Sequence, residues 1–434
     1  MIIVNILKIV NIAFSALFMI CYSYQVLFLI LSLFQKPKKY GDTDKSKKYA
    51  IITSARNEED VIGQLCACIK NQDYPSDKID LFVVADNCTD GTADVARENG
   101  AIVYERNNEE LPGKGHALGE LFAHIKNTVG YDTYDAYIIV DADNILEPNY
   151  VSEMDKCFSD GGRIIVGYRN SKNFGTNWIT AGYGLWFMRE ARQLNIVRTN
   201  LKTTCDVKGT GFLVSSDIIK RQDGWIHKLL IEDIQFTVEN VLSGEKVVYC
   251  HDAVLYDEQP TSFKDSWWQR TRWCRGYMQI LKRYSGRLLG GFVKGLFKGR
   301  GFSRFDLWMS MSPAFFITLA MLAINVVGFI ALAIVDASLL PGALWTVVPS
   351  AIGAYALFWL VGLLTAIYEW DRIKIPNVKK ILYTFTFPVF MATYVPIAAF
   401  ALFVRAKWKP IQHHPVSEEE LDAVKGEDGK KNEK

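Results

Sequence analysis

The chain has 434 residues, which is enough for one large globular domain and further segments, and its formal net charge is only +2. This balance argues against a nucleic-acid partner, which would favour a strongly basic face. Hydrophobic residues make up 50% of the sequence but are unevenly distributed. Positions 45–305 have the composition of a soluble α/β domain, whereas both flanks are strongly apolar.

The first apolar run, at positions 12–34, is long enough for a transmembrane helix, which needs about 20 apolar residues. A cleaved signal peptide is the alternative, but the run is long for one, lacks an Ala-x-Ala-like site and follows only Lys8. We therefore predict a retained anchor over residues 1–35. Three more apolar runs lie at 311–335, 346–368 and 381–404. They predict a C-terminal membrane region over 309–405.

Basic residues beside these runs predict their orientation, because loops rich in Lys and Arg stay in the cytosol. After the first run come Lys36, Lys38, Lys39, Lys45, Lys47 and Lys48. Before the second run come Lys282, Arg283, Arg287, Lys294, Lys298, Arg300 and Arg304. This pattern predicts a multi-pass protein of the cell membrane with a cytosolic central domain. A third C-terminal crossing would place Arg405 outside, but Pro388 and Pro396 allow a kinked or re-entrant segment, so the side of the tail stays open.

Positions 45–280 alternate short apolar strands with helical stretches. The expected strands are 49–53, 81–85, 102–104 and 137–140, and the expected helices are 59–71, 93–99 and 115–125. Such alternation predicts an α/β domain with a mainly parallel sheet covered on both faces. Ligands bind beyond the carboxyl ends of the strands in these sheets. Asp86 and Asp141 each follow a strand, so we expect both to face one crevice.

The remaining segments carry weaker signals. The basic stretch 281–305 predicts amphipathic helices at the membrane surface, with an ordinary basic connector as the alternative. The charged tail 410–434 has a composition typical of disorder. None of the eight cysteines forms a C-x-x-C pair, so we expect small core residues rather than a zinc site or a disulfide.

Asp141-Ala142-Asp143 directly follows the apolar strand 137–140. Two carboxylates on a tight turn offer the oxygen ligands that Mg²⁺ and Mn²⁺ prefer, with diphosphate oxygens and water completing the shell. Such a metal would neutralise a leaving diphosphate. Asp-x-Asp pairs are also common in solvated turns, but the position after a buried strand favours a metal site.

Asp86 and Lys114 are candidates for binding a nucleotide diphosphate. Asp86 could bind the base or the ribose, or support the metal; a cap for the helix 92–99 is the alternative. Lys114 lies in Pro112-Gly113-Lys114-Gly115-His116, where the glycines would let the backbone approach a diphosphate and the ammonium would add positive charge. This stretch matches neither the P-loop nor the G-x-G-x-x-G pattern, so an ATPase or dehydrogenase loses its main support.

Glu232-Asp233 lies between Leu229–Ile231 and Ile234, so we expect at least one of the two carboxylates to face a cleft. A hydroxyl that attacks an anomeric carbon needs a base to accept its proton, and Asp233 is our choice. The alternative is a pair of acids that stabilise the N-terminus of a helix.

Gln269, Arg272 and Trp273 have the spacing i, i+3 and i+4 and so share one helix face. Arg and Gln can hold diphosphate and acceptor oxygens, while an indole offers a flat surface for a pyranose. An Arg/Trp stripe more often anchors a helix at a membrane interface. The acids upstream favour a binding role here. We assign no catalytic role to His116, His251, His413 or His414.

Taken in order, these motifs resemble those of the membrane-embedded family 2 glycosyltransferases, which include cellulose, hyaluronan, poly-N-acetylglucosamine and bacterial exopolysaccharide synthases. The resemblance covers roughly positions 49–275, and the apolar flanks are of the same kind. It implies a GT-A fold, with a mainly parallel sheet flanked by transmembrane helices. It also implies an inverting single displacement on a nucleotide-diphosphate sugar.

The resemblance also implies roles for donor-side residues. Asp86 resembles the uridine-side acid, and Asp141 and Asp143 resemble the metal motif, with Asp141 also on the donor side. Lys114, between its two glycines, looks most like its counterpart in exopolysaccharide synthases. The first nucleotide loop is matched loosely, because the usual Pro is missing; the matching residues are Ser54, Asn57 and Glu58.

On the acceptor side, Asp233 resembles the catalytic base of the family's Thr/Ser-Glu-Asp motif, here Ile231-Glu232-Asp233. Gln269, Arg272 and Trp273 match Gln-x-x-Arg-Trp, which in this family holds the acceptor end and accompanies processive synthesis. The chain shows no Arg-rich cyclic-dinucleotide-binding domain of the cellulose synthase type and fewer C-terminal spans than hyaluronan synthase. We therefore do not expect control by such a nucleotide.

The leading hypothesis is a processive, inverting synthase that elongates a β-linked glycan from UDP-glucose or UDP-N-acetylglucosamine, with Mg²⁺ or Mn²⁺. Single transfer to a lipid acceptor, such as an isoprenoid phosphate or a ceramide-like lipid, is the alternative. A non-enzymatic sugar-binding scaffold is the third hypothesis. The expected partners are the UDP-sugar, the glycan or lipid acceptor and membrane lipids, together with accessory or export subunits or a second copy of the chain. No nucleic acid is expected.

Overall fold

The computed structural model describes residues 1–296, 301–404 and 413–415. Its centre is an eight-stranded sheet in the order β3-β2-β1-β4-β7-β6-β8-β5. The strands are β1 (Tyr49–Ala55), β2 (Ile79–Asp86), β3 (Ile102–Arg106), β4 (Ala136–Ile139), β5 (Ile145–Leu146), β6 (Ile164–Ser171), β7 (Phe212–Ser215) and β8 (Val247–Asp257). The pairs β1–β2, β1–β4, β2–β3 and β6–β8 are parallel, whereas β5 and β7 are antiparallel to their neighbours. The prediction of a mainly parallel sheet is confirmed.

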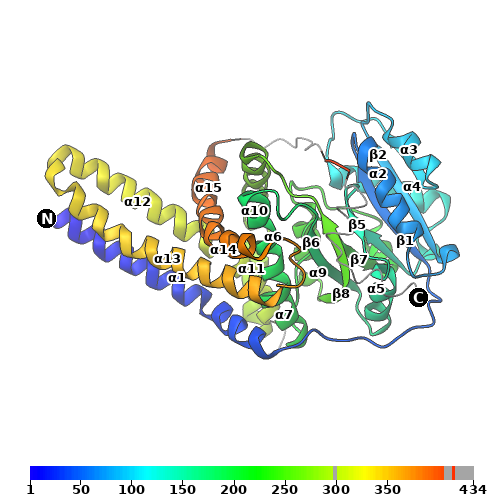
Figure 1. Ribbon diagram of the computed structural model, residues 1–434, viewed down its shortest axis with the longest axis horizontal. Coiled ribbons are helices and arrows are strands. Elements are labelled where there is room, and N and C mark those ends of the chain that lie inside the picture. The colour runs from blue at the N-terminus through cyan, green and yellow to red at the C-terminus, as the bar shows by residue number, and fades with distance from the viewer. Residues whose placement is uncertain (297–300, 405–412, 416–434) are drawn as a thin grey trace.

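Helices cover both faces of this sheet (Figure 1). They are α2 (Glu59–Lys70), α3 (Thr92–Glu98), α4 (Lys114–Thr128), α5 (Tyr150–Ser159), α6 (Trp178–Arg189), the π-helical segment Glu190–Asn195, α7 (Ile196–Asn200), α8 (Ser216–Gln222) and α9 (Glu232–Leu242). In β1, Ala50 and Ile52 join the core beneath α4, while Tyr49 and Ile51 join the core beneath α2. Successive strand residues face opposite sides and both sides are covered, which explains the continuous apolar run.

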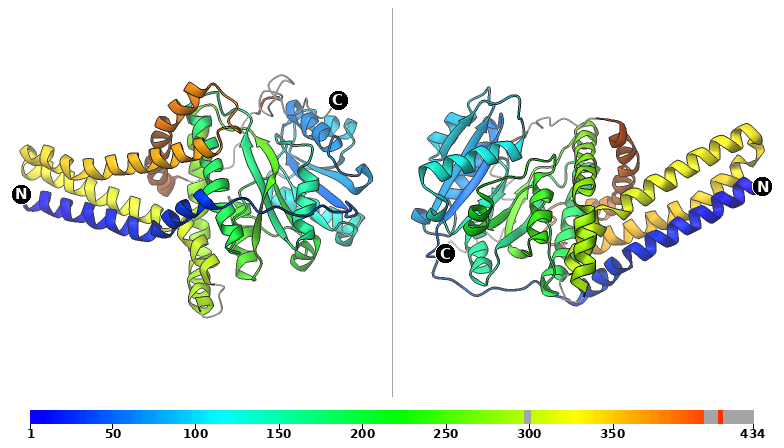
Figure 2. Two further views of the ribbon diagram at one scale, coloured as in Figure 1. Left: turned by 60° about the horizontal axis from the view of Figure 1, so that its bottom comes forward. Right: turned by 180° about the vertical axis from the view of Figure 1, so that it is seen from behind.

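Three helices extend from this domain as a bundle: α1 (Ile2–Phe34), α12 (Pro313–Val335) and α13 (Leu340–Tyr368) (Figures 1 and 2). The amides of Asn11 and Asn325 hydrogen-bond each other at 3.0 and 2.7 Å, and Ser15 bonds Ser350 at 3.0 Å. Such bonds are typical between membrane helices. Among the described residues, these three helices and the 377–403 segment are long and apolar enough to cross a membrane.

The last apolar segment is bent. It forms α14 (Asn377–Ala392) and α15 (Tyr394–Phe403), which lie beside α6 and α10 (Phe263–Gly295) rather than along the bundle (Figure 1). Gly182 of α6 allows this contact, because a Cβ there would lie 2.4 Å from the ring of Phe390. Arg270 of α10 donates to Thr393 at the bend, at 2.6 Å. The segment is therefore kinked, and the break falls at Thr393, between Pro388 and Pro396.

The C-terminal tail returns to the sheet domain. Nδ1 of His413 lies 3.0 Å from both carboxylate oxygens of Glu58, which follows β1. Of the tail, residues 413–415 therefore lie against the sheet domain, and the side of a membrane on which the tail lies stays open. The expectation of disorder for 410–434 lies outside the described residues, apart from 413–415.

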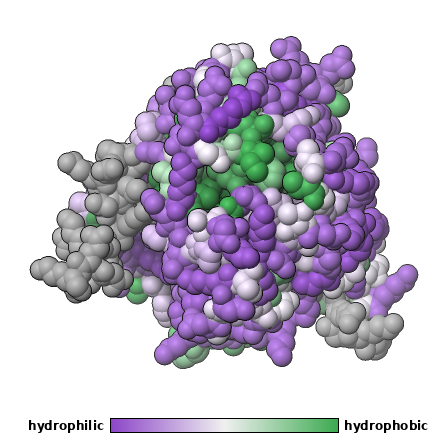
Figure 3. Space-filling model, turned by 90° about the vertical axis from the view of Figure 1, so that its right-hand side faces the viewer, coloured by the Kyte–Doolittle hydropathy of each residue, from purple (hydrophilic) through white to green (hydrophobic). Residues whose placement is uncertain are grey.

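The two parts of the molecule have different surfaces. The face of the sheet domain turned away from the bundle is mainly hydrophilic, with apolar side chains gathered in one central area (Figure 3). On the bundle, by contrast, large apolar side chains are exposed, among them Ile12, Val327, Ile334 and Ile352. Exposed apolar surface of this extent marks an interaction site, and on helices of this length lipid is the fitting environment. At the junction, α10 and α11 (Gly301–Met311) lie together, in the region where the sequence predicts interface helices.

Candidate active site

One cavity of about 1680 Å³ runs from the carboxyl ends of the parallel strands to the helices of the bundle. It brings together nearly all of the residues that the sequence marks as functional. Those lining it are Ser54, Glu58, Asp86, Lys114, Asp141, Asp143, Asp233, Gln269, Arg272 and Trp273. The crevice expected at the strand ends is therefore present.

Asn57 is the exception and does not line the cavity. It adopts a positive φ of 56°, and its side-chain oxygen accepts a hydrogen bond from the Thr89 amide at 2.8 Å. This bond ties the loop after β1 to the loop after β2. Asn57 thus shapes the donor side from outside the cavity, while Ser54 and Glu58 of the same loop reach its wall.

Asp86 stands at the end of β2 and is 4% exposed. Arg106 of β3 and Asn87 both donate to its Oδ1. Arg106 in turn pairs with Glu120 on α4, at 2.9 Å. These partners fix the direction of the Asp86 carboxylate, as a group that binds a ribose or a base requires. Thr92 and Asp90, rather than Asp86, make the local hydrogen bonds at the start of α3.

Three carboxylates meet in the cavity that Asp86 also lines: Asp141, Asp143 and Asp257, whose oxygens lie within 4.8 Å of one another. Asp141 and Asp143 follow β4, and Asp257 ends β8. Asp257 accepts hydrogen bonds from Arg169 Nε at 2.9 Å and from Asn144 at 2.9 Å, and Asp143 accepts one from the Glu258 amide at 3.1 Å. The fold thereby holds three acids together in a largely buried position.

The electrostatics of this group fit a divalent cation. Burial and the neighbouring Asp257 carboxylate raise the pKa of Asp143 to about 7. A cation among the three oxygens would relieve that repulsion, and hard oxygen donors are the ligands that Mg²⁺ and Mn²⁺ prefer. Asp141, Asp143 and Asp257 could therefore hold such a metal, with Asp257 a ligand that the sequence prediction missed.

Lys114 is the first residue of α4, and its ammonium binds Asp141 and the Gly209 carbonyl, the latter at 2.8 Å. Burial opposes its charge, but Asp141 and Glu232 raise the pKa of Lys114. The neighbouring Gly115 is needed for packing: a Cβ there would lie 2.4 Å from the His227 carbonyl oxygen. Gly115 therefore permits a close contact between two backbone segments, while Lys114 places its positive charge beside Asp141.

Glu232 and Asp233 form the first turn of α9, and both line the cavity. Burial and the Asp233 carboxylate raise the pKa of Glu232 to about 7, and burial also raises the pKa of Asp233. Lys114 and Arg272 oppose that rise. A carboxylate with a raised pKa in a buried cleft is well suited to accept a proton. The two acids do lie at the N-terminus of a helix, as the alternative interpretation expects. A role in stabilising that terminus does not explain why both side chains line the cavity.

Gln269, Arg272 and Trp273 share one face of α10, as the spacing predicts, and all three line the cavity. Arg272 donates to the Leu230 carbonyl at 3.1 Å, next to the Glu232–Asp233 turn. The amide oxygen of Gln269 is buried and has no hydrogen-bond partner among the described residues. Arg270, on the other face, is fully buried against α14 and has a structural role.

Several cavity residues were missed by sequence reasoning. His413 lines the cavity, and although burial opposes it, Asp143 and Glu58 raise the pKa of His413 to about 10. Asp257 could have been found from the sequence, because it ends the apolar-rich strand Val247–Asp257, as Asp86 ends its own strand. Glu190, Asp206 and Lys208 gave none, because their grouping depends on a π-helical turn and a loop that meet only in the folded chain.

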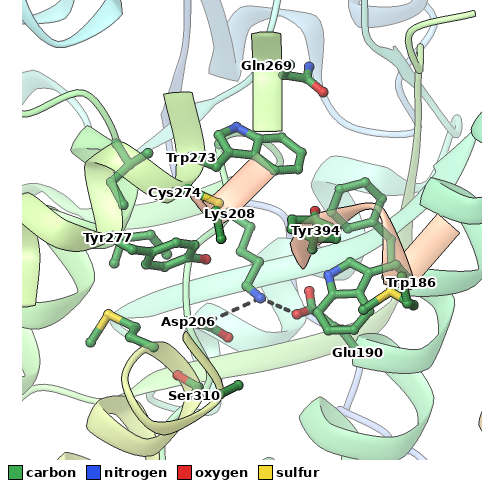
Figure 4. A pocket seen from close by; sticks show the side chains of 18 of the residues that line it. Trp186, Glu190, Asp206, Lys208, Gln269, Trp273, Cys274, Tyr277, Ser310 and Tyr394 are labelled. Carbon is green, nitrogen blue, oxygen red and sulfur yellow. Dashed lines mark hydrogen bonds and ion pairs between the residues drawn. The ribbon is translucent and has the colours of Figure 1, made fainter. Parts of the chain in front are cut away.

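Another part of the cavity wall is mainly apolar. It is formed by side chains of α1, α12, α13 and α14, including Phe14, Phe18, Met19, Ile317, Met321 and Phe358. The same cavity is lined by Glu190, Lys208 and four aromatic rings, those of Trp186, Trp273, Tyr277 and Tyr394, which lie together (Figure 4). We call this part, with Asp206, the aromatic chamber.

Residues 47–276, more than half of the chain, match the family model described as glycosyltransferase like family 2. The chain is a family 2 glycosyltransferase. The probable glycosyltransferase YdaM of Bacillus subtilis is 26% identical over 271 residues, which cover 57% of this chain and 59% of that protein. Two β-monoglucosyldiacylglycerol synthases match as well. That of Nostoc sp. is 25% identical, over 57% of this chain and 53% of its own length. That of Synechocystis sp. is 27% identical, over 53% of this chain and 47% of its own length. The chain therefore spans between about half and three-fifths of the length of these curated relatives.

Among solved structures, the mannosyltransferase PcManGT of Pyrobaculum calidifontis, in complex with GDP-Man and Mn²⁺, is similar with a TM-score of 0.58. The match covers 92% of this chain and 99% of that chain, at 16% sequence identity. At this identity the likeness establishes the fold alone. The family 2 glycosyltransferase therefore has the GT-A-like α/β fold that the sequence implied, together with helices apolar enough to span a membrane.

Proposed function

We propose that this family 2 glycosyltransferase catalyses the inverting transfer of one hexose from a UDP-sugar to a lipid acceptor held between its membrane helices. The observation that carries the proposal is the continuity of one cavity of about 1680 Å³ from the three-aspartate group to the apolar faces of α1, α12, α13 and α14. An acyl or isoprenoid chain fits an apolar cleft between helices, whereas a hydrated glycan does not.

In the proposed reaction, the hydroxyl group of the acceptor approaches the anomeric carbon of the donor from the side of Asp233. Asp233 accepts the hydroxyl proton, the hydroxyl oxygen bonds to the anomeric carbon, and the bond from that carbon to the diphosphate breaks. Attack opposite to the leaving diphosphate inverts the configuration. Lys114 and Arg272 place positive charge beside the departing phosphates.

A metal ion would complete the donor site. Asp141, Asp143 and Asp257 would hold Mg²⁺ or Mn²⁺, which neutralises charge on the leaving diphosphate when bound. Asp86 would bind the nucleoside, with Ser54 and Glu58 on the same wall. The basic residues around the first two apolar runs support a cytosolic orientation, where UDP-sugars are available.

Processive elongation of a β-linked glycan, such as an exopolysaccharide, is the second candidate. It is favoured by the common face of Gln269, Arg272 and Trp273 beside Asp233. On that proposal the helices of the bundle, with a second copy or accessory subunits, would guide the polymer.

Product size separates the two candidates. The full-length chain, purified in detergent, is given UDP-glucose or UDP-N-acetylglucosamine with Mg²⁺ or Mn²⁺ and a bilayer lipid extract. We expect UDP release together with lipids that carry one added sugar, detected by mass spectrometry. Long polymer with no glycosylated lipid would contradict the lipid proposal and support processive synthesis. Asp233→Asn is the control that must remove either product.

A further inference from the structure

A second pocket lies between α10 and α11, outside the cavity that contains the aromatic chamber. It shares none of its described lining residues with that cavity, and the proposed reaction uses none of them. The lining residues are Leu242, Gly286, Arg287, Gly290, Gly291, Lys294 and Arg304. Three of them are cations, and no carboxylate lines the pocket among the residues that the structure describes.

The glycines of α10 provide the space for this pocket. No atom lies within 4 Å of the place where a Cβ of Gly286 or Gly290 would stand. At Gly291 a Cβ would lie 2.6 Å from Cδ of Arg304, and Arg304 donates to the Gly291 carbonyl at 3.2 Å. A guanidinium has five N–H donors, so this bond fixes Arg304 in place and leaves donors for an anion. Glycine weakens a helix interior, and a need for space explains its use here.

The other cations of the pocket are also available to a ligand. Arg287 and Lys294 are exposed, and Arg283 lies on the same face of α10, at the spacing i, i+4 and i+11. None of these three forms an ion pair within the described part of the chain. The acid of α11, Asp306, is buried and pairs instead with Arg198, at 2.7 Å. Positive charge therefore gathers at the pocket without a neighbouring acid to balance it.

An exposed apolar face lies beside this charged face. Leu289, Val293 and Leu296 have the spacing i, i+4 and i+7 on α10 and are 37%, 58% and 54% exposed, and Phe302 of α11 is 36% exposed. The inner face of α10 already packs against α9, so these side chains are not part of that core. A helix with an apolar face next to a cationic one is typical of helices that lie in the interface of a membrane.

The direction of the two helices agrees with that position. In both views of Figure 2, α10 and α11 run across the direction of the bundle formed by α1, α12 and α13. Nε1 of Trp308 donates to Oγ of Ser285 at 3.2 Å, which holds α11 against α10, and α12 begins at Pro313, just after α11 ends. A bundle that crosses a membrane stands along the membrane normal, so helices that run across it at its base lie along the surface, at the level of the lipid headgroups.

We propose that the pocket between α10 and α11 binds the phosphate of an anionic bilayer phospholipid, whose acyl chains lie against the exposed apolar face of α10. Guanidinium and ammonium groups form charge-assisted hydrogen bonds with phosphate oxygens. A zwitterionic headgroup would bring its own ammonium close to three cations, which disfavours it. The inference does not depend on which acceptor the transferase uses, because the pocket is separate from the cavity.

The first test compares two lipids that differ in headgroup charge. The full-length chain in detergent is titrated with dioleoylphosphatidylglycerol or with dioleoylphosphatidylcholine, and native mass spectrometry measures the Kd of each. We expect phosphatidylglycerol to bind more tightly by about tenfold or more, because each Lys or Arg near an anionic membrane surface contributes about fivefold. Equal affinities would overturn the inference.

Two variants locate the binding at the pocket. Arg287→Gln with Lys294→Gln keeps the bond between Arg304 and Gly291 and should weaken binding of phosphatidylglycerol by roughly 25-fold, the effect of two cations. Gly290→Leu keeps every charge but fills the space over the helix, so it should weaken the same binding by about tenfold. If Gly290→Leu binds as the unmodified chain does, the lipid is attracted by surface charge alone, and the pocket is not its site.

A matched control removes two cations elsewhere. Lys70→Gln with Lys126→Gln changes exposed residues of α2 and α4, at the end of the sheet domain away from the bundle (Figure 1). This variant should keep the preference for phosphatidylglycerol, and a loss equal to that of Arg287→Gln with Lys294→Gln would overturn the inference. Affinity for UDP, measured by calorimetry, shows that each variant is folded.

A competition experiment identifies the source of the phosphate. Inorganic phosphate at the concentration of the lipid should not displace phosphatidylglycerol, because it lacks the acyl chains that the apolar face would hold. Displacement would show a site for a soluble anion and would overturn the lipid proposal. All of these measurements report lipid binding, so their outcomes are distinguishable from those for the proposed function, which is tested by the size of the glycosylated product.

Discussion

The donor half and the membrane half of the cavity are built in opposite ways. In the donor half, Asp86, Asp141 and Asp257 stand at strand ends, and hydrogen bonds from rigid neighbours fix their direction. In the membrane half, helices α1, α12, α13 and α14 supply apolar side chains with few polar anchors. On the proposed function, the donor half specifies the reaction through charge and geometry, whereas the membrane half specifies the acceptor through shape and burial. Asp233 lines the same cavity as both.

The largest expected effect comes from removing the proposed base. Asp233→Asn should lower the rate of transfer by about 10²- to 10⁴-fold, because the acceptor hydroxyl loses its proton acceptor. UDP binding should be retained. UDP release and calorimetry measure the two quantities. Asp94→Asn, at an exposed position on α3, is the matched control; equal activity of the two variants would contradict the role of Asp233.

Asp257→Asn should disrupt the donor half alone. Loss of one of the three grouped carboxylates should weaken Mn²⁺ binding by roughly 10- to 100-fold, with a parallel loss of UDP-sugar affinity. Electron paramagnetic resonance of bound Mn²⁺ reports the metal without any need for activity. Asp143→Ala should weaken metal and donor binding in the same way. Normal Mn²⁺ affinity in Asp257→Asn would remove this residue from the site.

Thr318→Trp should disrupt the membrane half alone. Thr318 of α12 lines the cavity, so an indole there should raise the KM for a lipid acceptor by about tenfold while the KM for the UDP-sugar stays unchanged. Ala333→Trp, on the exposed side of the same helix, adds the same bulk outside the cavity. If both variants behave alike, the apolar part of the cavity does not hold the acceptor.

The pH dependence tests the pair Glu232–Asp233. Burial raises the pKa of both groups, to about 7 for Glu232, so transfer should decline toward acid pH as Asp233, the proposed base, becomes protonated, and this decline should begin above the range of an ordinary aspartate. Glu232→Gln removes a neighbouring negative charge and should move this decline to lower pH. A rate profile from pH 5 to 9, roughly the range in which the pair titrates, measures the shift.

The same variant has a stability signature. A buried carboxylate whose pKa is raised from 4.5 to about 7 on folding favours the protonated folded state, so it weakens the folded state progressively as the pH rises between those values. Glu232→Gln should therefore stabilise the protein more at pH 8 than at pH 5, about one unit above and two below that raised pKa. Thermal unfolding in detergent checks the sign, and equal effects at both pH values would contradict the burial of this charge.

The smallest expected effect lies outside the cavity, within the bundle. Asn11→Ala leaves the amide of Asn325 without its reciprocal partner and should lower the free energy of unfolding by about 1 kcal/mol. Transfer should be nearly unchanged. Thermal unfolding and UDP release measure the two effects, with Ala16→Gly in the same helix as a comparison for helix propensity. A large loss of activity in Asn11→Ala would show that this hydrogen bond between helices is needed for transfer and not only for stability.

The sequence alone was sufficient where structure and chemistry are local. The apolar runs before Asp86 and Asp141 predict strands, and parallel strands bring their ends together, so the donor site followed from chain order. The spacing of Gln269, Arg272 and Trp273 follows from helix geometry in the same way. The length and hydropathy of the flanking segments predicted all four candidate spans, since lipid imposes a simple requirement on composition.

Tertiary structure decided what depends on distant segments. Asp257 joins Asp141 and Asp143 only because β8 lies in the same sheet, and Lys208 meets Glu190 only because a loop reaches a π-helical turn. The contact of His413 with Glu58 and the bend between α14 and α15 are likewise visible only in the folded chain. These features arise from contacts between residues far apart in the chain, which local patterns do not encode. The sequence therefore determined the reaction class, while the folded chain decided the shape and charge of the acceptor site.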